Sequence, residues 1–156
     1  MMVTFEDQQA ALAAILGTIS GLTIEVDYPD AIQRRDLPCV VIALGEATYD
    51  RVQRGANSLR ITRSGKLLLF GQEAALGREY QSEKVVKPFL TSIPVALAAY
   101  PTATLADGTG FEIVLLNGRD SGPIPITYNQ KLYVGAVLYF STVVEAYIAA
   151  ADSRVL

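Results

Sequence analysis

The chain of 156 residues has no histidine, no tryptophan and a single cysteine, Cys39. Without histidine, neither a Ser-His-Asp or Cys-His catalytic site nor a histidine-based metal site can form. One cysteine alone forms neither an internal disulfide nor a zinc site. Because Cys39 lies in the apolar run LPCVVIAL, we expect it to be a small buried core residue. These absences predict a protein with no enzymatic activity, no cofactor and no metal.

Charged residues are also scarce, at 19% of the chain against 51% hydrophobic residues. A monomer that keeps its whole surface in water needs more charge, so we expect some apolar surface to face a partner. No apolar stretch reaches the roughly 18 residues needed to span a bilayer. The beginning of the chain is acidic and lacks the basic region of a signal peptide. The length predicts a single domain over residues 1–156.

Hydrophobic periodicity predicts a short list of helices and strands. Thr4 and Asp7 form a capping-box pattern at the start of a helix that ends near Gly21. Pro88 and Pro94 predict that the second helical region is broken in two or kinked at Pro88. The expected elements are a helix over 4–20, strands over 22–28, 37–47 and 59–70, a helical region over 73–99, and strands over 111–118 and 133–148.

This order, with short connections between strands, favours antiparallel pairing. It predicts an α+β fold built as a two-layer sandwich. The expected sheet is mainly antiparallel with about five strands, and two helices, the second one kinked, pack on one of its faces. Two structures are compatible with Gly65: a tight turn at Ser64–Gly65 in a protruding hairpin, or a bulge in one long bent strand.

The last strand has two different faces. Its even positions, from Val134 to Ile148, suit a core. Its odd positions mix Tyr133 and Tyr139 with small and polar residues, as subunit interfaces commonly do. An aromatic-rich sheet face exposed to water is the alternative, since a tyrosine hydroxyl stays hydrated there.

A basic polar arm at about residues 47–66 lies between two of the predicted strands. Its five cations are Arg51, Arg54, Arg60, Arg63 and Lys66, and residues 51–66 contain no carboxylate although the chain carries a net charge of −3. The arm could be a solvated loop, a phosphate-binding segment for nucleic acid, or a contact for an acidic surface on another subunit.

The first 30 residues offer such an acidic surface, because they contain no lysine or arginine. Its carboxylates include Glu6, Asp7, Glu25 and Asp27. A basic patch on one copy that meets an acidic patch on the next makes a head-to-tail contact, and such contacts can close into a ring.

The overall pattern resembles the tail terminator, or tail-completion, proteins of long-tailed bacteriophages. The residues that carry the resemblance are Tyr28-Pro29 and Leu37-Pro38 in the segment LTIEVDYPDAIQRRDLPCVVIALGEATYDR, a polar arm before KLLLF, a helical region, and the final strand YVGAVLYFSTVVEAY. The chain length and the order of elements agree with that family, so the resemblance covers about residues 4–148.

The resemblance implies a structural protein of the virion without catalytic residues. Proteins of this family form a hexameric ring on the head-proximal end of the tail tube, stop its polymerisation and offer a surface to the neck or head connector. The implied partners are copies of the same chain, the tail tube protein and the connector, with DNA only passing through the ring and no membrane. Assembly would take place in the cytoplasm of the host bacterium. The alternatives are another neck or head–tail connector protein and, in a different class, a regulatory subunit of a bacterial enzyme.

A basic lumen would hold DNA by its phosphates. We therefore expect most of the five cations to face a neighbouring subunit rather than the hole of a ring. Reversing the charge of Arg60 and Arg63 to glutamate should then weaken self-association, as measured by light scattering. Unchanged assembly would count against the head-to-tail contact.

Overall fold

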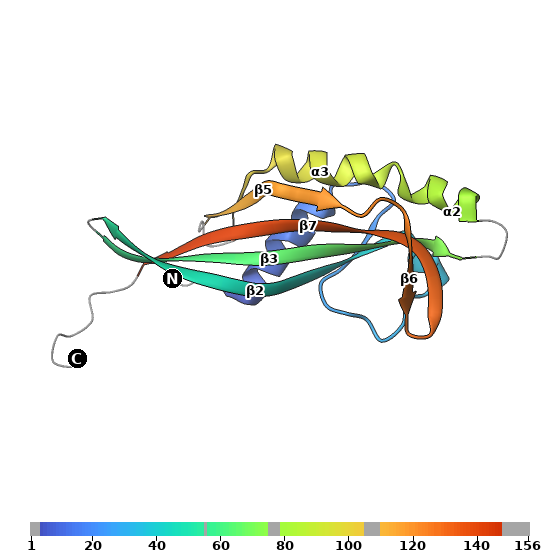
Figure 1. Ribbon diagram of the computed structural model, residues 1–156, viewed down its shortest axis with the longest axis horizontal. Coiled ribbons are helices and arrows are strands. Elements are labelled where there is room, and N and C mark those ends of the chain that lie inside the picture. Colours follow the sequence, from blue (N-terminus) through green and yellow to red (C-terminus); the bar gives the residue numbers. More distant parts are fainter. Residues whose placement is uncertain (1–3, 55, 75–78, 105–109, 148–156) are drawn as a thin grey trace.

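The computed structural model describes residues 4–54, 56–74, 79–104 and 110–147, which form one curled sheet with helices beside it (Figure 1). The described strands follow the order β1-β2-β3-β7-β5-β4, and β6 pairs with β7 outside this path. The elements are α1 (Phe5–Leu16), β1 (Thr23–Glu25), the 3-10 helix η1 (Arg34–Asp36), β2 (Cys39–Arg54), β3 (Ala56–Glu73), α2 (Glu79–Val86), α3 (Phe89–Ala99), β4 (Thr102–Thr104), β5 (Gly110–Asp120), β6 (Ile124–Tyr128) and β7 (Lys131–Tyr147).

The prediction of a two-layer sandwich with about five strands is wrong. The described sheet has seven strands and is mixed, because β1 runs parallel to β2 while the other pairs are antiparallel. The short strands β4 and β6 were missed. The two prolines of the segment PIPI are typical of a loop, yet β6 tolerates Pro125, since β6 pairs on one side only and an edge strand can lack an N–H.

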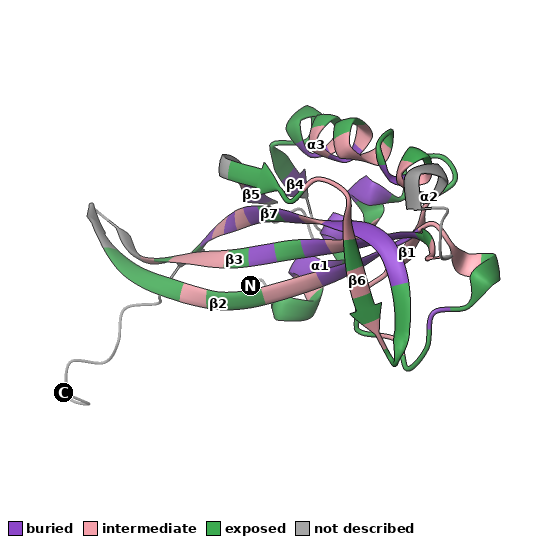
Figure 2. Cartoon of the chain, turned by 45° about the vertical axis from the view of Figure 1, so that its right-hand side comes forward, coloured by how far each residue is buried: buried purple, intermediate pink, exposed green. Residues whose placement is uncertain are grey.

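Both faces of the sheet carry a core, which is the second reason why the sandwich prediction failed. The larger core lies under α1 and α3 and includes Leu12, Leu69 and Ile93. A smaller core lies on the opposite face at one end of the sheet, where residues 29–38 and β6 fold over Phe70 and Tyr133 (Figure 2). The sheet is therefore the middle layer of three at that end.

The local signals in the helices were more reliable. The capping box of α1 is confirmed: the backbone N–H of Asp7 donates to the Thr4 hydroxyl at 3.1 Å, and the Thr4 N–H donates to the Asp7 carboxylate at 3.0 Å. The second helical region is two segments, because α2 ends at Val86 and Pro88 is the N-cap of α3. In β7, the even positions from 134 to 144 are all buried, as predicted.

Strand β3 runs without interruption through Gly65, so the tight turn at Ser64–Gly65 is wrong. The hairpin between β2 and β3 turns instead between Arg54 and Ala56. A bulge is present, but it lies in β2, where Gly45 and Glu46 together face Ser64. Gly65 pairs with Phe140 of β7. A Cβ atom on residue 65 would lie 2.5 Å from Cζ of the Phe140 ring, so the ring occupies the space that the glycine leaves.

We expect Gly65→Ala to destabilise the fold by about 1–3 kcal/mol, because the added methyl group overpacks a buried contact. The measurement is urea unfolding of the variant and of the wild type. In a Phe140→Leu background the same change should cost clearly less, because the two residues share one space. An equal cost in both backgrounds would show that the ring does not set the requirement for glycine.

Candidate interaction surfaces

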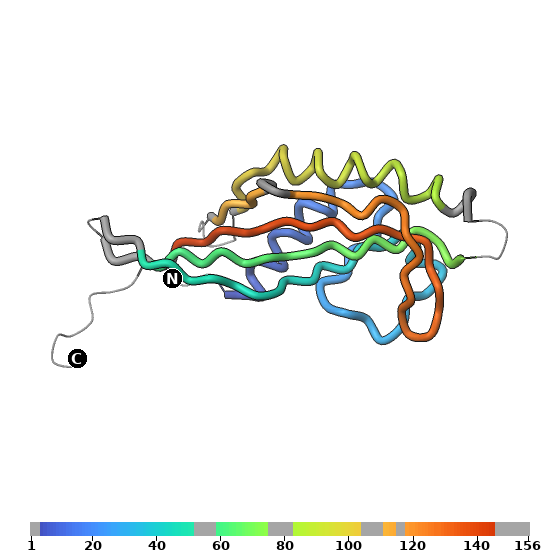
Figure 3. Tube along the Cα trace, viewed as in Figure 1, coloured from blue at the N-terminus to red at the C-terminus, as the bar shows by residue number. Residues whose placement is uncertain are grey.

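The basic arm is the distal half of the β2–β3 hairpin, and it projects beyond the helices (Figures 1 and 3). Residues 47–54 pair in register with residues 56–63, so the arm is a strand hairpin rather than a loop. On the side of β3 opposite β2, strand β7 pairs with β3 as far as Ser58. The side chains of residues 52–58, including Arg54, lie outside the described part of the structure.

Arg60 is paired within its own subunit. Its guanidinium donates two hydrogen bonds to the Glu145 carboxylate, at 2.8 and 3.2 Å, across the β3–β7 register. The hydrogen bond and charge of Glu145 raise the pKa of Arg60, with further contributions from Asp50 and Glu112. This cation therefore already lies among carboxylates of the same chain.

Arg63 holds the bulge of β2. It donates a hydrogen bond from Nη1 to the Gly45 carbonyl at 2.8 Å, and its guanidinium lies 5.0 Å from the centroid of the Phe5 ring. The Ser64 hydroxyl donates to the Glu46 carbonyl at 3.1 Å. A bulge leaves backbone carbonyls without a ladder partner, and these two side chains satisfy them. Reversal of Arg63 and Arg60 would therefore break contacts inside the subunit as well as any contact between subunits.

The remaining described cations of the arm, Arg51 and Lys66, are exposed but lie on opposite faces of the hairpin. Lys66 and Arg60 share the face away from α1 and α3, while Arg51 pairs with Leu59 and Arg63 points to the helical side. The arm is thus not a single basic patch, because the period of a strand is two residues and the bulge shifts β2 by one position.

The predicted acidic surface is partly assembled. Gln9 of α1 donates hydrogen bonds to the Val26 carbonyl at 3.0 Å and to the Asp27 carboxylate at 3.3 Å. This contact places Asp27 beside the helix whose first turn carries Glu6 and Asp7. Glu6 and Asp27 are exposed, while Asp7 caps the helix and Glu25 is half-buried in β1.

Of the two tyrosines predicted at an interface, one is internal. Tyr133 is only 2% exposed, and its ring packs edge-to-face on Phe70 with centroids 5.5 Å apart. The prediction that Tyr133 lies at a subunit interface is wrong, because residues 29–38 cover this end of the face. Tyr139 is 36% exposed, and the Arg119 guanidinium lies over its ring at 4.2 Å from the centroid.

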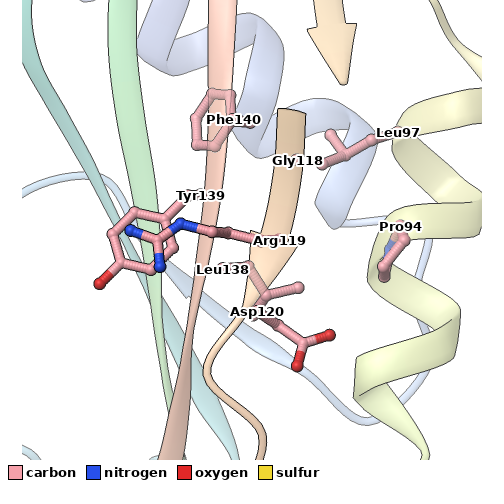
Figure 4. A pocket seen from close by; sticks show the side chains of 8 residues that line it. All are labelled: Pro94, Leu97, Gly118, Arg119, Asp120, Leu138, Tyr139 and Phe140. Atoms are coloured by element: carbon pink, nitrogen blue, oxygen red, sulfur yellow. The ribbon is translucent and has the colours of Figure 1, made fainter. Parts of the chain in front are cut away.

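A cavity of about 320 Å³ lies between α3 and the edge of the sheet (Figure 4). Pro94 and Leu97 of α3 face Leu138 across it, and Arg119 and Asp120 lie at its rim. Within the described residues, no group of three or more Asp, Glu or Cys side chains could hold a metal ion. The lining therefore offers an apolar contact rather than a set of converging acid–base groups.

Cys39 is buried in the smaller core, as the sequence predicts, and is 1% exposed. Burial, with smaller contributions from the charges of Glu25 and Asp36, raises the pKa of its thiol to about 12. Burial likewise raises the pKa of Tyr133 and of Tyr128 nearby. The thiol is therefore neutral and unreactive at physiological pH.

A scan against protein-family models finds no match for this chain, and a search of curated proteins finds none either. Among the described residues, no helix is long and apolar enough to cross a membrane.

The Cys39 thiol should make the fold sensitive to alkali. The folded pKa of about 12 lies above the ordinary value of 9.0, so the unfolded chain loses this proton first. The difference in unfolding free energy between wild type and Cys39→Ala should be constant below pH 9. Between pH 9 and 12 it should fall by up to about 1.4 kcal/mol per pH unit.

The measurement is urea unfolding of both proteins over this pH range. The variant is the matched control for the buried tyrosines, which titrate in the same direction in both chains. If the difference in unfolding free energy between the two proteins does not change with pH, the thiol of Cys39 is not held neutral by burial.

Proposed function

We propose that this chain is a structural protein of the bacteriophage virion, which caps the head-proximal end of the tail tube as a ring. In this role it ends polymerisation of the tube and forms the joining surface for the neck or head connector. It performs no catalysis, and it is assembled into the tail in the cytoplasm of the host bacterium. The resemblance of residues 4–148 to tail terminator proteins supports this function.

The projecting arm is the observation that carries the proposal. Beyond the helices, its helical side leaves Tyr49 64% exposed, with Leu59 and Ile61 half-buried beside it. Burial of such a surface by another chain is favourable, because it removes apolar area from water. Arg51 lies on the same side and adds a charge that fixes orientation more than affinity.

The edge of the sheet gives a second reason for assembly. Strand β1 pairs with β2 only at Cys39–Val41, and from Ile42 to Arg54 the described part of the chain places no strand on the side of β2 opposite β3. Unpaired N–H and C=O groups along such an edge are a template for a strand of another chain. A repeated contact from the arm of one copy to the edge and acidic helix of the next is head-to-tail, and such a contact forms a ring when its rotation closes.

The charges are compatible with a ring through which DNA passes. Arg60 and Arg63 bond to groups of their own subunit, and Arg51 and Lys66 are the other described cations of the arm, both exposed. We propose that Arg51 faces the neighbouring subunit.

Arg51→Glu should lower the yield of rings, while Arg35→Glu should leave it unchanged. Both variants remove one exposed cation and add one carboxylate, but Arg35 lies in η1, next to the end of β2 that is opposite the arm. The measurement is negative-stain imaging of each protein alone and mixed with tubes assembled from the tail tube subunit of the same phage.

Rings on the tube ends with the wild type and Arg35→Glu, but not with Arg51→Glu, are the expected result. Wild-type protein that leaves the tube ends bare would overturn the proposed function. Binding to a head connector but not to tubes would favour a different neck protein.

A further inference from the structure

The sheet face opposite α1 and α3 is covered at one end only. Residues 29–38 and β6 cover that end (Figure 2). Toward the arm, the residues on this side of β2, β3, β7 and β5 are exposed or half-buried. We call this part the open face, and Arg60, Lys66, Tyr139 and Glu145 lie on it.

One end of the open face is acidic. Arg60 pairs with Asp50 of β2 on one side and with Glu145 of β7 on the other. Glu112 of β5 pairs with Val143, which lies two residues before Glu145 in β7. Three carboxylates thus surround one guanidinium. Arg60 and Glu145 are bonded at 2.8 Å, so the end keeps an excess of negative charge. A hollow of about 640 Å³ lies here, bordered by Arg60, Glu112 and Glu145.

The other end is basic. Lys66 pairs with Tyr139, and the Arg119 guanidinium lies over the Tyr139 ring. Asp120 does not neutralise this pair, because it points away from Tyr139 and accepts a hydrogen bond from the Gly122 N–H at 2.8 Å (Figure 4). A second hollow of about 430 Å³ lies here, bordered by Tyr28, Lys66 and Tyr139.

Mostly small uncharged residues separate the two ends, together with the exposed Glu46 of β2, which lies opposite Ser64. Thr62 and Ser64 of β3 lie beside Val143 and Ser141 of β7. The six steps between the seven residues from Tyr139 to Glu145 span about 20 Å at the rise of a strand. The open face therefore carries opposite charges at its two ends, with one carboxylate residue, Glu46, at the β2 side between them.

We infer that the open face binds a second copy of this chain in an antiparallel, two-fold arrangement. The acidic end of each copy then lies over the basic end of the other, and both junctions are attractive. In a parallel arrangement of the two copies, ends of like charge would face each other. It would also bring together the two raised ends formed by residues 29–38 and β6. Because one patch serves both partners, this contact closes at two subunits.

The contact is expected to be weak and sensitive to salt. Four strands about 4.8 Å apart and roughly 20 Å long give a footprint of about 400 Å². A stable complex covers about 800 Å² on each partner. Surface charges lose most of their attraction when salt shortens the Debye length. The dimer uses a surface separate from the helical side of the arm, so it does not rest on the proposed function.

The test uses two charge-reversed variants of the full chain in sedimentation equilibrium at low salt. The first variant, Lys66→Glu with Arg119→Glu, makes both ends acidic. The second, Asp50→Lys with Glu112→Lys, makes both ends basic and leaves the Arg60–Glu145 pair in place. Each variant alone should dimerise at least about tenfold more weakly than the wild type, because four exposed ion pairs are lost per dimer.

Mixing the two variants should restore a dimer, because an all-acidic face then meets an all-basic one at both junctions. Arg35→Glu with Lys131→Glu changes the net charge as the first variant does but lies off the open face. It should dimerise like the wild type. Urea unfolding of each variant checks that the fold is retained.

A wild type that stays monomeric at the highest concentration would overturn the proposal. So would a mixture that fails to dimerise, or an Arg51→Glu variant, which lacks the ring contact, whose species keep growing beyond two subunits. The Arg51→Glu variant should keep the dimer, so loss of rings and loss of dimers are separate results.

Discussion

The pairing of β3 with β7 along residues 58–70, and with β2 on its other side through a single bulge, is the constraint on which the rest of the structure depends. The residues of β3 alternate between two cores: Leu67 and Leu69 face the helices, while Leu68 and Phe70 face residues 29–38 and β6. A shift of one residue in this register would exchange the two sets and expose both. The positions of the arm, the open face and the smaller core all follow from this register.

Two local features let β3 stay continuous through the polar segment. Gly65 leaves room for the Phe140 ring, which keeps the larger core closed near the base of the arm. The bulge at Gly45 and Glu46 changes which residues of β2 share a face with β3. Ala43 and Thr48 therefore lie on the same side although one position is odd and the other even. Arg63 and Ser64 stabilise the bulge by bonding to its carbonyls.

The cations of the arm therefore have different roles. Arg63 supports the backbone, Arg60 belongs to a cluster of carboxylates, and Arg51 and Lys66 are left on opposite faces. These roles are compatible with a chain that presents two separate surfaces to other chains. The helical side of the arm offers apolar contacts, and the open face offers opposite charges. In a chain with so few charged residues, such an arrangement favours orientation over strength.

The sequence by itself determined the features that depend on neighbouring residues in the chain. Thr4 and Asp7 fixed the start of α1, Pro88 fixed the break between α2 and α3, and the alternation in β7 fixed its core face. The apolar run around Cys39 likewise predicted its burial. Each of these depends on backbone geometry over a few residues.

Only the tertiary structure decided which surfaces remain open. Tyr133 and Tyr139 occupy equivalent positions of one strand, yet residues far away in the chain cover the first and not the second. Likewise, Arg60 and Glu145 are 85 residues apart, and only the register brings them together. The short strands β4 and β6 form because β5 and β7 offer edges to pair with. Pairing between distant strands depends on both partners at once, and the local pattern of one segment does not contain it.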